Sequence, residues 1–122
     1  METEEKKYET LQEFWPYYVS EHKNPLNRKL HLLGTGAGVL GLTTSIVKKK
    51  PKYALLGILA GYGLSWAGHF LVEKNKPATF KYPVKSFLSD LIMSSLMLRD
   101  KMEEEAKRIE ILQEEEQSLY AD

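Results

Sequence analysis

The chain has 122 residues, of which 43% are hydrophobic and 28% charged, so it has room for one small domain and little more. It has no cysteine, which excludes disulfide frameworks, cysteine-ligated zinc, iron–sulfur clusters and thiolate nucleophiles. The zero net charge is a sum of unlike parts: residues 1–21 carry −4, residues 22–98 carry +9 and residues 99–122 carry −5. A basic middle is typical of proteins that bind nucleic acid or a membrane surface, and the apolar residues must decide between the two.

The N-terminal part predicts one amphipathic helix and the start of a second. Residues 8–22 place aromatic and apolar side chains at three- and four-residue spacing, with Pro16 as a point of interruption or kinking. Asn24 and Pro25 then supply a helix N-cap followed by proline at the first helical position. A new helix is therefore expected to begin at this point.

The middle of the chain predicts a membrane helical hairpin over residues 32–72. Two uncharged apolar stretches, residues 32–47 and 53–72, flank the basic loop of residues 48–52, and the second stretch is close to the length of a spanning helix. Two buried helices of a soluble bundle are the alternative, but the chain has too few other apolar segments to cover them. Glycines in the first stretch allow a partner helix to approach closely, and a homo-oligomer that buries this glycine face is possible.

The C-terminal part predicts two further helices. Pro83 opens a helix in which one stripe suits a membrane face, formed by Val84, Phe87, Leu88, Leu91 and Ile92. Asp90 is expected on a solvated polar face, and the alternative is that it is a distal partner of the histidines. The last 24 residues predict a solvated, charged helical tail. The fold class is therefore all-α, divided into a membrane domain of residues 1–98 and a tail of residues 99–122. Nucleic-acid binding is disfavoured, because the basic residues flank lipid-length segments and form no stripe with aromatics.

The three histidines are the residues with the clearest chemical potential. His31 lies 17 residues before Lys48 and His69 lies 17 residues after Lys52, so in antiparallel helices each is about 26 Å from the basic loop. The two side chains are therefore expected at the same depth, and His22 can fold back over that end. Three neutral imidazoles suit a transition metal such as iron or zinc. The alternative is that each is an interfacial polar residue at a helix end.

Two polar residues share a helix face with these histidines. Asn27 stands four residues before His31, and Glu73 stands four residues after His69. Each is a candidate orienting residue, and either could supply an oxygen ligand or take part in catalysis. The simpler alternative is a helix-surface amide and a helix-end carboxylate. One of the basic residues Lys23, Arg28 and Lys29 is expected to attract a substrate carboxylate, and the alternative is that they pair with phospholipid headgroups.

The same residues carry a resemblance to a known family. Over about residues 11–98, the chain resembles the family of the fungal 2-hydroxy-fatty-acid dioxygenase, in particular its short bacterial-type branch. The matching motifs are, in order, His22, Asn27-Arg28, His31 and Gly34, and then Gly68-His69-Phe70, Glu73 and Pro77-Ala78-Thr79-Phe80.

The resemblance implies a membrane enzyme that uses Fe(2+) and dioxygen to shorten 2-hydroxy fatty acids by one carbon. The imidazole positions that match are His22, His31 and His69. The expected localisation is integral to a lipid bilayer, the endoplasmic reticulum if the source is eukaryotic or the inner membrane if it is bacterial. The excess of basic residues on the histidine side favours a cytoplasmic position for that side and for both termini. A non-enzymatic membrane scaffold that binds a partner is the alternative function.

Overall fold

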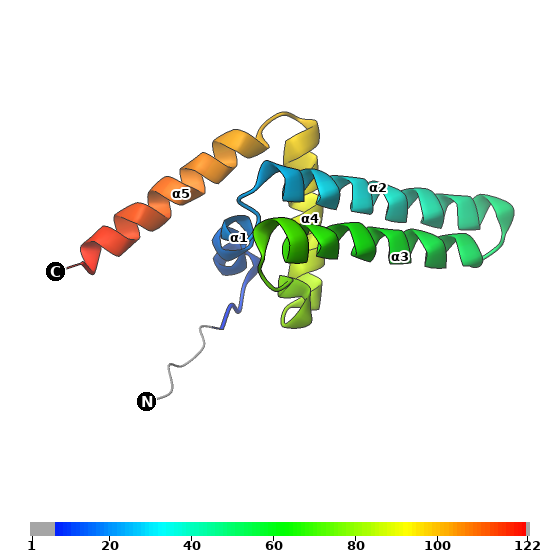
Figure 1. The fold of residues 1–122 in the computed structure, drawn as a ribbon, viewed down its shortest axis with the longest axis horizontal. Helices are drawn as coiled ribbons and strands as arrows, with labels where there is room; N and C mark the ends of the chain where they lie inside the picture. The colour runs from blue at the N-terminus through cyan, green and yellow to red at the C-terminus, as the bar shows by residue number, and fades with distance from the viewer. Residues whose placement is uncertain (1–6, 122) are drawn as a thin grey trace.

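The computed structural model describes residues 7–121, and every regular element in that range is a helix (Figure 1). The elements in chain order are α1 (Leu11–Ser20), α2 (Pro25–Lys48), α3 (Lys52–Ala67), a π-helical turn η1 (Gly68–Glu73), a 3-10 turn η2 (Ala78–Phe80), α4 (Pro83–Leu98) and α5 (Met102–Leu119). The prediction of an all-α fold with a long helical hairpin, flanking helices and a charged C-terminal helix is confirmed.

The helix starts follow the predicted capping chemistry. The Thr10 hydroxyl accepts a hydrogen bond from the backbone N–H of Glu13 at 3.1 Å and begins α1. The Asn24 side chain accepts from the N–H of Leu26 at 2.9 Å and begins α2. α1 continues through Pro16 as a single helix. The short turn between α1 and α2 therefore places His22 beside the first turn of the hairpin.

The hairpin is held together by glycines that face each other. A Cβ atom added to Gly34 would lie 2.7 Å from the carbonyl oxygen of Gly61, and one added to Gly41 would lie 2.5 Å from that of Tyr53. A Cβ on Gly57 would meet the Cα of Gly41 at 3.0 Å. The backbones of α2 and α3 thus approach as closely as the glycines were predicted to allow. The glycine contacts at Gly34, Gly41, Gly57 and Gly61 are made within one chain, whereas a Cβ on Gly36, Gly38 or Gly63 would have no atom within 4 Å. A homo-oligomer stays a prediction.

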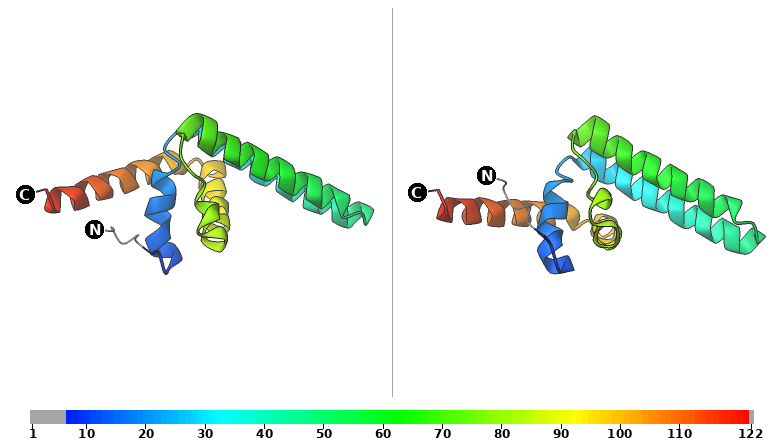
Figure 2. Two further views of the ribbon diagram at one scale, coloured as in Figure 1. Left: turned by 60° about the horizontal axis from the view of Figure 1, so that its bottom comes forward. Right: turned by 90° about the horizontal axis from the view of Figure 1, so that it is seen from below.

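The hairpin extends away from the remaining helices. Its tip lies at one end of the molecule and the C-terminal end of α5 lies at the other, in all three views (Figures 1 and 2). α2 and the continuous helical segment formed by α3 and η1 are each long and apolar enough to cross a membrane, and only 17% of the apolar 18-residue part of each is buried. Core helices of a soluble bundle would be mostly buried, so this exposure is the opposite of what the soluble alternative requires.

α4 crosses the base of the hairpin (Figure 1). Its polar side faces inward. Ser86, Ser89 and Ser94 are buried. The exposed side carries the apolar stripe seen in the sequence, namely Val84, Phe87, Leu88, Leu91 and Ile92. A water-soluble helix would have the reverse arrangement, so α4 has the sidedness of a helix whose outer face meets lipid.

The C-terminal helix is docked on the rest of the molecule along one stripe. Met102 and Ile109 are each 3% exposed and join a core that contains Phe14 of α1. The indole N–H of Trp15 donates to a carboxylate oxygen of Glu105 at 3.0 Å. The prediction of a solvated tail is therefore wrong for this face, whereas most other residues of α5 are exposed. The division into residues 1–98 and 99–122 stays a prediction.

Candidate metal centre

Three histidines from three separate elements meet at the base of the hairpin. His22 lies in the turn after α1, His31 in α2 and His69 in η1, and their candidate ligand atoms all lie within 4.8 Å of one another. The side chains are 0%, 5% and 2% exposed, respectively. The expected meeting of His31 and His69 at one depth, with His22 folded over them, is what the structure contains.

Each imidazole is oriented by a hydrogen bond at Nδ1. The acceptors are the carbonyl oxygen of Tyr18 at 2.6 Å from His22, the carbonyl oxygen of Asn27 at 2.9 Å from His31, and the side-chain Oδ1 of Asn75 at 2.7 Å from His69. The Asn75 amide is oriented in turn, because its Nδ2 donates to the backbone carbonyl and the carboxylate of Glu21, which can only accept. Carbonyl oxygens are acceptors, so each Nδ1 carries the proton and each Nε2 presents a lone pair.

The unprotonated Nε2 atoms face one another. Those of His22 and His31 are 3.2 Å apart, and two lone pairs at that distance cannot form a hydrogen bond with each other. Two nitrogens bound at about 2.1 Å to one metal ion would be about 3.0–3.4 Å apart for octahedral to tetrahedral angles. The pair therefore fits a shared cation. Burial lowers the pKa of His22 well below its ordinary value, so this imidazole is neutral at pH 7 and free to coordinate.

The π-helical turn decides which polar residues surround His69. A π-helix has a wider turn than an α-helix, so a spacing of four residues no longer places two side chains on one face. After η1 the backbone reverses at Lys74 (φ 58°), and the N–H of Asn75 bonds to the carbonyl of His69 at 3.0 Å. Asn75 is thereby brought under the His69 ring. The sequence analysis did not identify it, because its role depends on this turn.

Glu73 lies beside the cluster but points elsewhere. Its carboxylate accepts the backbone N–H of Asn24 at 2.5 Å, at the start of α2. Within residues 7–121, the group of side chains able to hold a metal at this place consists of histidines alone. A ligand or catalytic role for Glu73 stays a prediction, and the contact that the structure gives it joins the two ends of the hairpin.

The side chain of Asn27, in the first turn of α2, is fully buried against the π-helical turn η1. A Cβ atom on Gly68 would lie 1.9 Å from Asn27 Oδ1, so only glycine fits opposite this amide. Its contact with the cluster is made by its backbone carbonyl, which holds His31. A catalytic role for the side chain stays a prediction.

Arg28 is an internal cation that holds the turn carrying His22. Its guanidinium is 2% exposed and donates to the carbonyl oxygens of His22 at 2.8 Å and Lys23 at 2.9 Å. It also pairs with Glu103 of α5 at 2.5 Å. The expectation that Arg28 meets substrate or phospholipid headgroups is therefore wrong, because its donors are used inside the protein. The contact links the C-terminal helix to the backbone of a candidate ligand.

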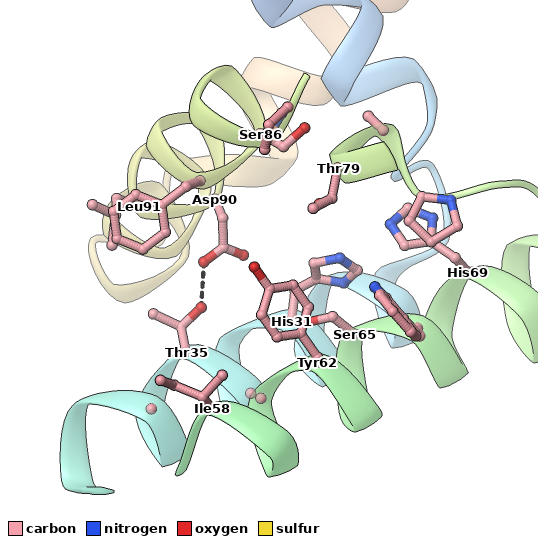
Figure 3. A pocket seen from close by; sticks show the side chains of 18 of the residues that line it. His31, Thr35, Ile58, Tyr62, Ser65, His69, Thr79, Ser86, Asp90 and Leu91 are labelled. Carbon is pink, nitrogen blue, oxygen red and sulfur yellow. Dashed lines mark hydrogen bonds between the residues drawn. The ribbon is translucent and has the colours of Figure 1, made fainter. Parts of the chain in front are cut away.

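A cavity of about 420 Å³ runs from the histidines along the hairpin, beneath α4 (Figure 3). Its wall on α2 extends from His31 to Leu42, about 16 Å at the rise of an α-helix. Most of this wall is apolar or glycine, and polar groups are concentrated near the histidines. The cavity therefore has the form expected for a ligand with a polar head and a long apolar chain.

Asp90 lies in this cavity and not on a solvated face. Its carboxylate accepts a hydrogen bond from the Thr35 hydroxyl (Figure 3). Burial raises the pKa of Asp90 to about 6, and hydrogen bonding from the hydroxyls of Thr35 and Tyr18 opposes that rise. The earlier expectation is wrong because α4 turns its polar side inward.

Comparison with known proteins gives one match. A family model described as 2-hydroxy-palmitic acid dioxygenase Mpo1-like matches residues 8–102. Comparisons with curated proteins and with solved structures gave no match. The matched range contains the three histidines and both walls of the cavity, and it ends at the first residue of α5.

Proposed function

The chain belongs to the 2-hydroxy-palmitic acid dioxygenase Mpo1-like family, and on that premise we propose that it is an iron-dependent dioxygenase that shortens 2-hydroxy fatty acids by one carbon at a membrane interface. The observation that carries the proposal is the set of three buried Nε2 atoms that face one another while each Nδ1 is held by an oxygen. This is the donor arrangement of a metal site, and it is more than an interfacial polar cluster requires.

His22, His31 and His69 would hold the metal. Ferrous iron, if bound by these three residues, would supply the redox and Lewis-acid chemistry that reaction of a 2-hydroxycarboxylate with dioxygen requires. The protein fixes the three rings through the carbonyls of Tyr18 and Asn27 and the side chain of Asn75. Asn27 and Glu73 act as positioning residues in this proposal, Asn27 on His31 and Glu73 on the start of α2.

The cavity would hold the substrate with its head at the histidines and its chain along the hairpin. The apolar wall of about 16 Å accommodates roughly a dozen methylene groups, because an extended chain rises by about 1.25 Å per carbon. In the proposed bilayer, the chain would pack against α2, α3 and α4 in place of lipid tails. The fatty acid suggested by the family name fits this shape.

The proposed setting is a lipid bilayer crossed by the hairpin. The lysines of the hairpin loop lie at one end, and the histidines lie about 26 Å away, near the other boundary. In this setting the exposed apolar stripe of α4 would lie in that boundary. The charged α5, which extends away from the hairpin (Figure 2), would lie in water. The seven basic residues on the histidine side against four in the loop favour a cytoplasmic position for that side and for both termini.

A non-enzymatic scaffold is not favoured. An anchor needs the apolar hairpin and an exposed partner surface, but it has no use for three buried imidazoles with oriented lone pairs. Such a cluster destabilises a protein that leaves it without a cation.

The direct test is turnover by the purified, iron-loaded protein. We expect 2-hydroxypalmitic acid and dioxygen to be consumed together, with a product one carbon shorter identified by mass spectrometry. Palmitic acid should not be consumed, and the His31→Ala variant should be inactive. A wild-type protein with full iron occupancy that consumes no 2-hydroxy acid would contradict the proposal.

A further inference from the structure

Two polar atoms on the inner face of α4 lack a partner and border the cavity. Ser86 is 5% exposed, and its Oγ has no hydrogen-bond partner. Asp90 Oδ1 is also buried without a partner, while the other oxygen of this carboxylate accepts the Thr35 hydroxyl. Ser86 and Asp90 are four residues apart, so they lie one above the other on the same side of the helix. Both line the cavity that begins at the histidines (Figure 3).

The position of Asp90 relates these atoms to the candidate metal centre. Its partner Thr35 follows His31 by four residues in α2, so the two side chains share one helix face. The unpartnered atoms of α4 therefore lie opposite the histidine end of the cavity. They are not beside its apolar end, which is formed by Leu42 and Ala54.

Buried polar atoms without a partner destabilise a fold and are uncommon in native proteins, so a pair of them in a cavity needs an explanation. Ser89 and Ser94 are also buried and unpartnered, but neither lines the cavity. They serve as small residues at helix contacts. Ser86 and Asp90 differ because the space in front of them can be filled by a ligand.

The chemistry of the two atoms selects the ligand group. A carboxylate oxygen can only accept, so Asp90 requires a donor. The serine hydroxyl can donate to the same group. A ligand hydroxyl satisfies both at once, because it can donate to Asp90 and accept from Ser86, whereas a methylene satisfies neither. The pKa of about 6 leaves the Asp90 carboxyl mainly ionised at pH 7, which favours a donating partner.

We infer that Ser86 and Asp90 form a hydroxyl-recognition subsite, which binds the hydroxyl beside the ligand carboxylate and so selects hydroxylated over plain fatty acids. The inference rests on the proposed function, because that function makes the ligand a fatty acid. It adds residues that act without touching the metal. Metal chelation and this subsite would therefore contribute separately to the choice of substrate.

The test is a binding measurement with 2-hydroxyoctanoic acid and octanoic acid, two short probes that differ by one hydroxyl. Binding to the full chain in lipid nanodiscs is followed by the fluorescence of Trp66, which lines the cavity. It is measured on anaerobic iron-loaded protein and on metal-free protein. Removal of the metal removes chelation, so any preference for the hydroxy acid that remains reports on the subsite.

We expect metal-free wild type to prefer the hydroxy acid, and Ser86→Ala to reduce that preference about 10-fold. Asp90→Ala should reduce it at least as much. Ser89→Ala is the matched control, because it removes a buried, unpartnered hydroxyl from the same helix but outside the cavity, and it should change nothing. Ser86→Ala should also keep or raise the melting temperature, which shows that the variant is folded.

Three results would overturn the subsite: no preference in metal-free wild type, the same preference in Ser86→Ala as in wild type, or an equal loss in Ser89→Ala. Failure of the proposed function would appear separately. In that case iron-loaded wild type would form no shortened product, whatever the binding preference.

Discussion

The buried side chains of α1 and α5 are aromatic or aliphatic, whereas those of α2, α3 and α4 are polar or small. Phe14, Tyr18 and Val19 are buried in α1, and Met102 and Ile109 in α5. In the hairpin and α4 the buried residues are, apart from Met93, Asn, Arg, His, Gly and Ser. α1 and α5 bury apolar side chains, as water-soluble proteins do. The hairpin and α4 bury polar and small side chains, which is typical of helices that pack in lipid.

This difference shows where each part of the molecule gets its stability and its function. Burial of apolar area between α1 and α5 stabilises this part of the molecule in water. The hairpin relies on close glycine packing, and its polar interior is available for a metal and a ligand. The two regions meet at Arg28, whose guanidinium holds the His22 turn and pairs with Glu103 of α5.

The largest effect is expected from a bulky residue at a glycine contact of the hairpin. Gly41→Leu places a side chain where a Cβ alone would meet a backbone oxygen at 2.5 Å, so α2 and α3 must separate. We expect a loss of more than about 3 kcal/mol in unfolding free energy, measured by denaturation in detergent. Gly36→Leu is the matched control, since nothing lies within 4 Å of its Cβ. Equal losses in both variants would contradict glycine packing as the basis of the hairpin.

Substitutions in the packed face of α5 should have the effects that they have in the core of a water-soluble protein. Ile109→Ala removes a side chain that is 3% exposed and should cost about 2–4 kcal/mol. Ile111→Ala, on the exposed side of the same helix, should change stability by less than about 0.5 kcal/mol. Thermal unfolding of the two variants measures the difference. If Ile109→Ala were as harmless as Ile111→Ala, α5 would not be docked as described.

A smaller effect is expected for the residue that orients His69. Asn75→Ala removes the acceptor for Nδ1 while leaving all three imidazoles in place, and it should weaken metal binding about 10- to 100-fold. Competition with a metal chelator measures the affinity. The exposed neighbour Lys76 provides a control, because Lys76→Ala should leave affinity unchanged. An unaltered affinity in Asn75→Ala would remove this residue from the site.

The smallest effect is a pH dependence caused by the buried carboxyl of α4. The pKa of Asp90 is raised from 3.8 to about 6, so between these values the folded state holds more protons than the unfolded state. Stability due to this group is therefore present below pH 4 and lost as the pH rises to 6, by about 2 kcal/mol. The difference between wild type and Asp90→Asn isolates it from the histidines. A difference that does not vary with pH would contradict the burial of Asp90.

The sequence was sufficient for features that depend on simple helix geometry. Equal spacing from the basic loop placed His31 and His69 at one depth, because two straight helices rise equally. Asn24 and Pro25 identified the start of α2 by their capping chemistry.

Features that depend on irregular backbone or on the surrounding solvent were missed. The hydrogen bond between Asn75 and His69 depends on a π-helical turn, which no residue pattern in the sequence predicts. The apolar stripe of α4 was recognised, but Asp90 was assigned to water because polar faces usually point outward. The docking of α5 depends on Met102 and Ile109, two apolar residues in an otherwise charged helix, which is a weak pattern.

The central claim, that three imidazoles form one iron site, is tested most directly by iron content after anaerobic ferrous loading. Elemental analysis should give one iron per chain for the wild type and almost none for His69→Ala, with the helical circular dichroism unchanged. Ser89→Ala should retain one iron per chain, since its buried hydroxyl lies outside the cavity. Full iron occupancy in His69→Ala, or no iron in the folded wild type, would contradict the metal centre.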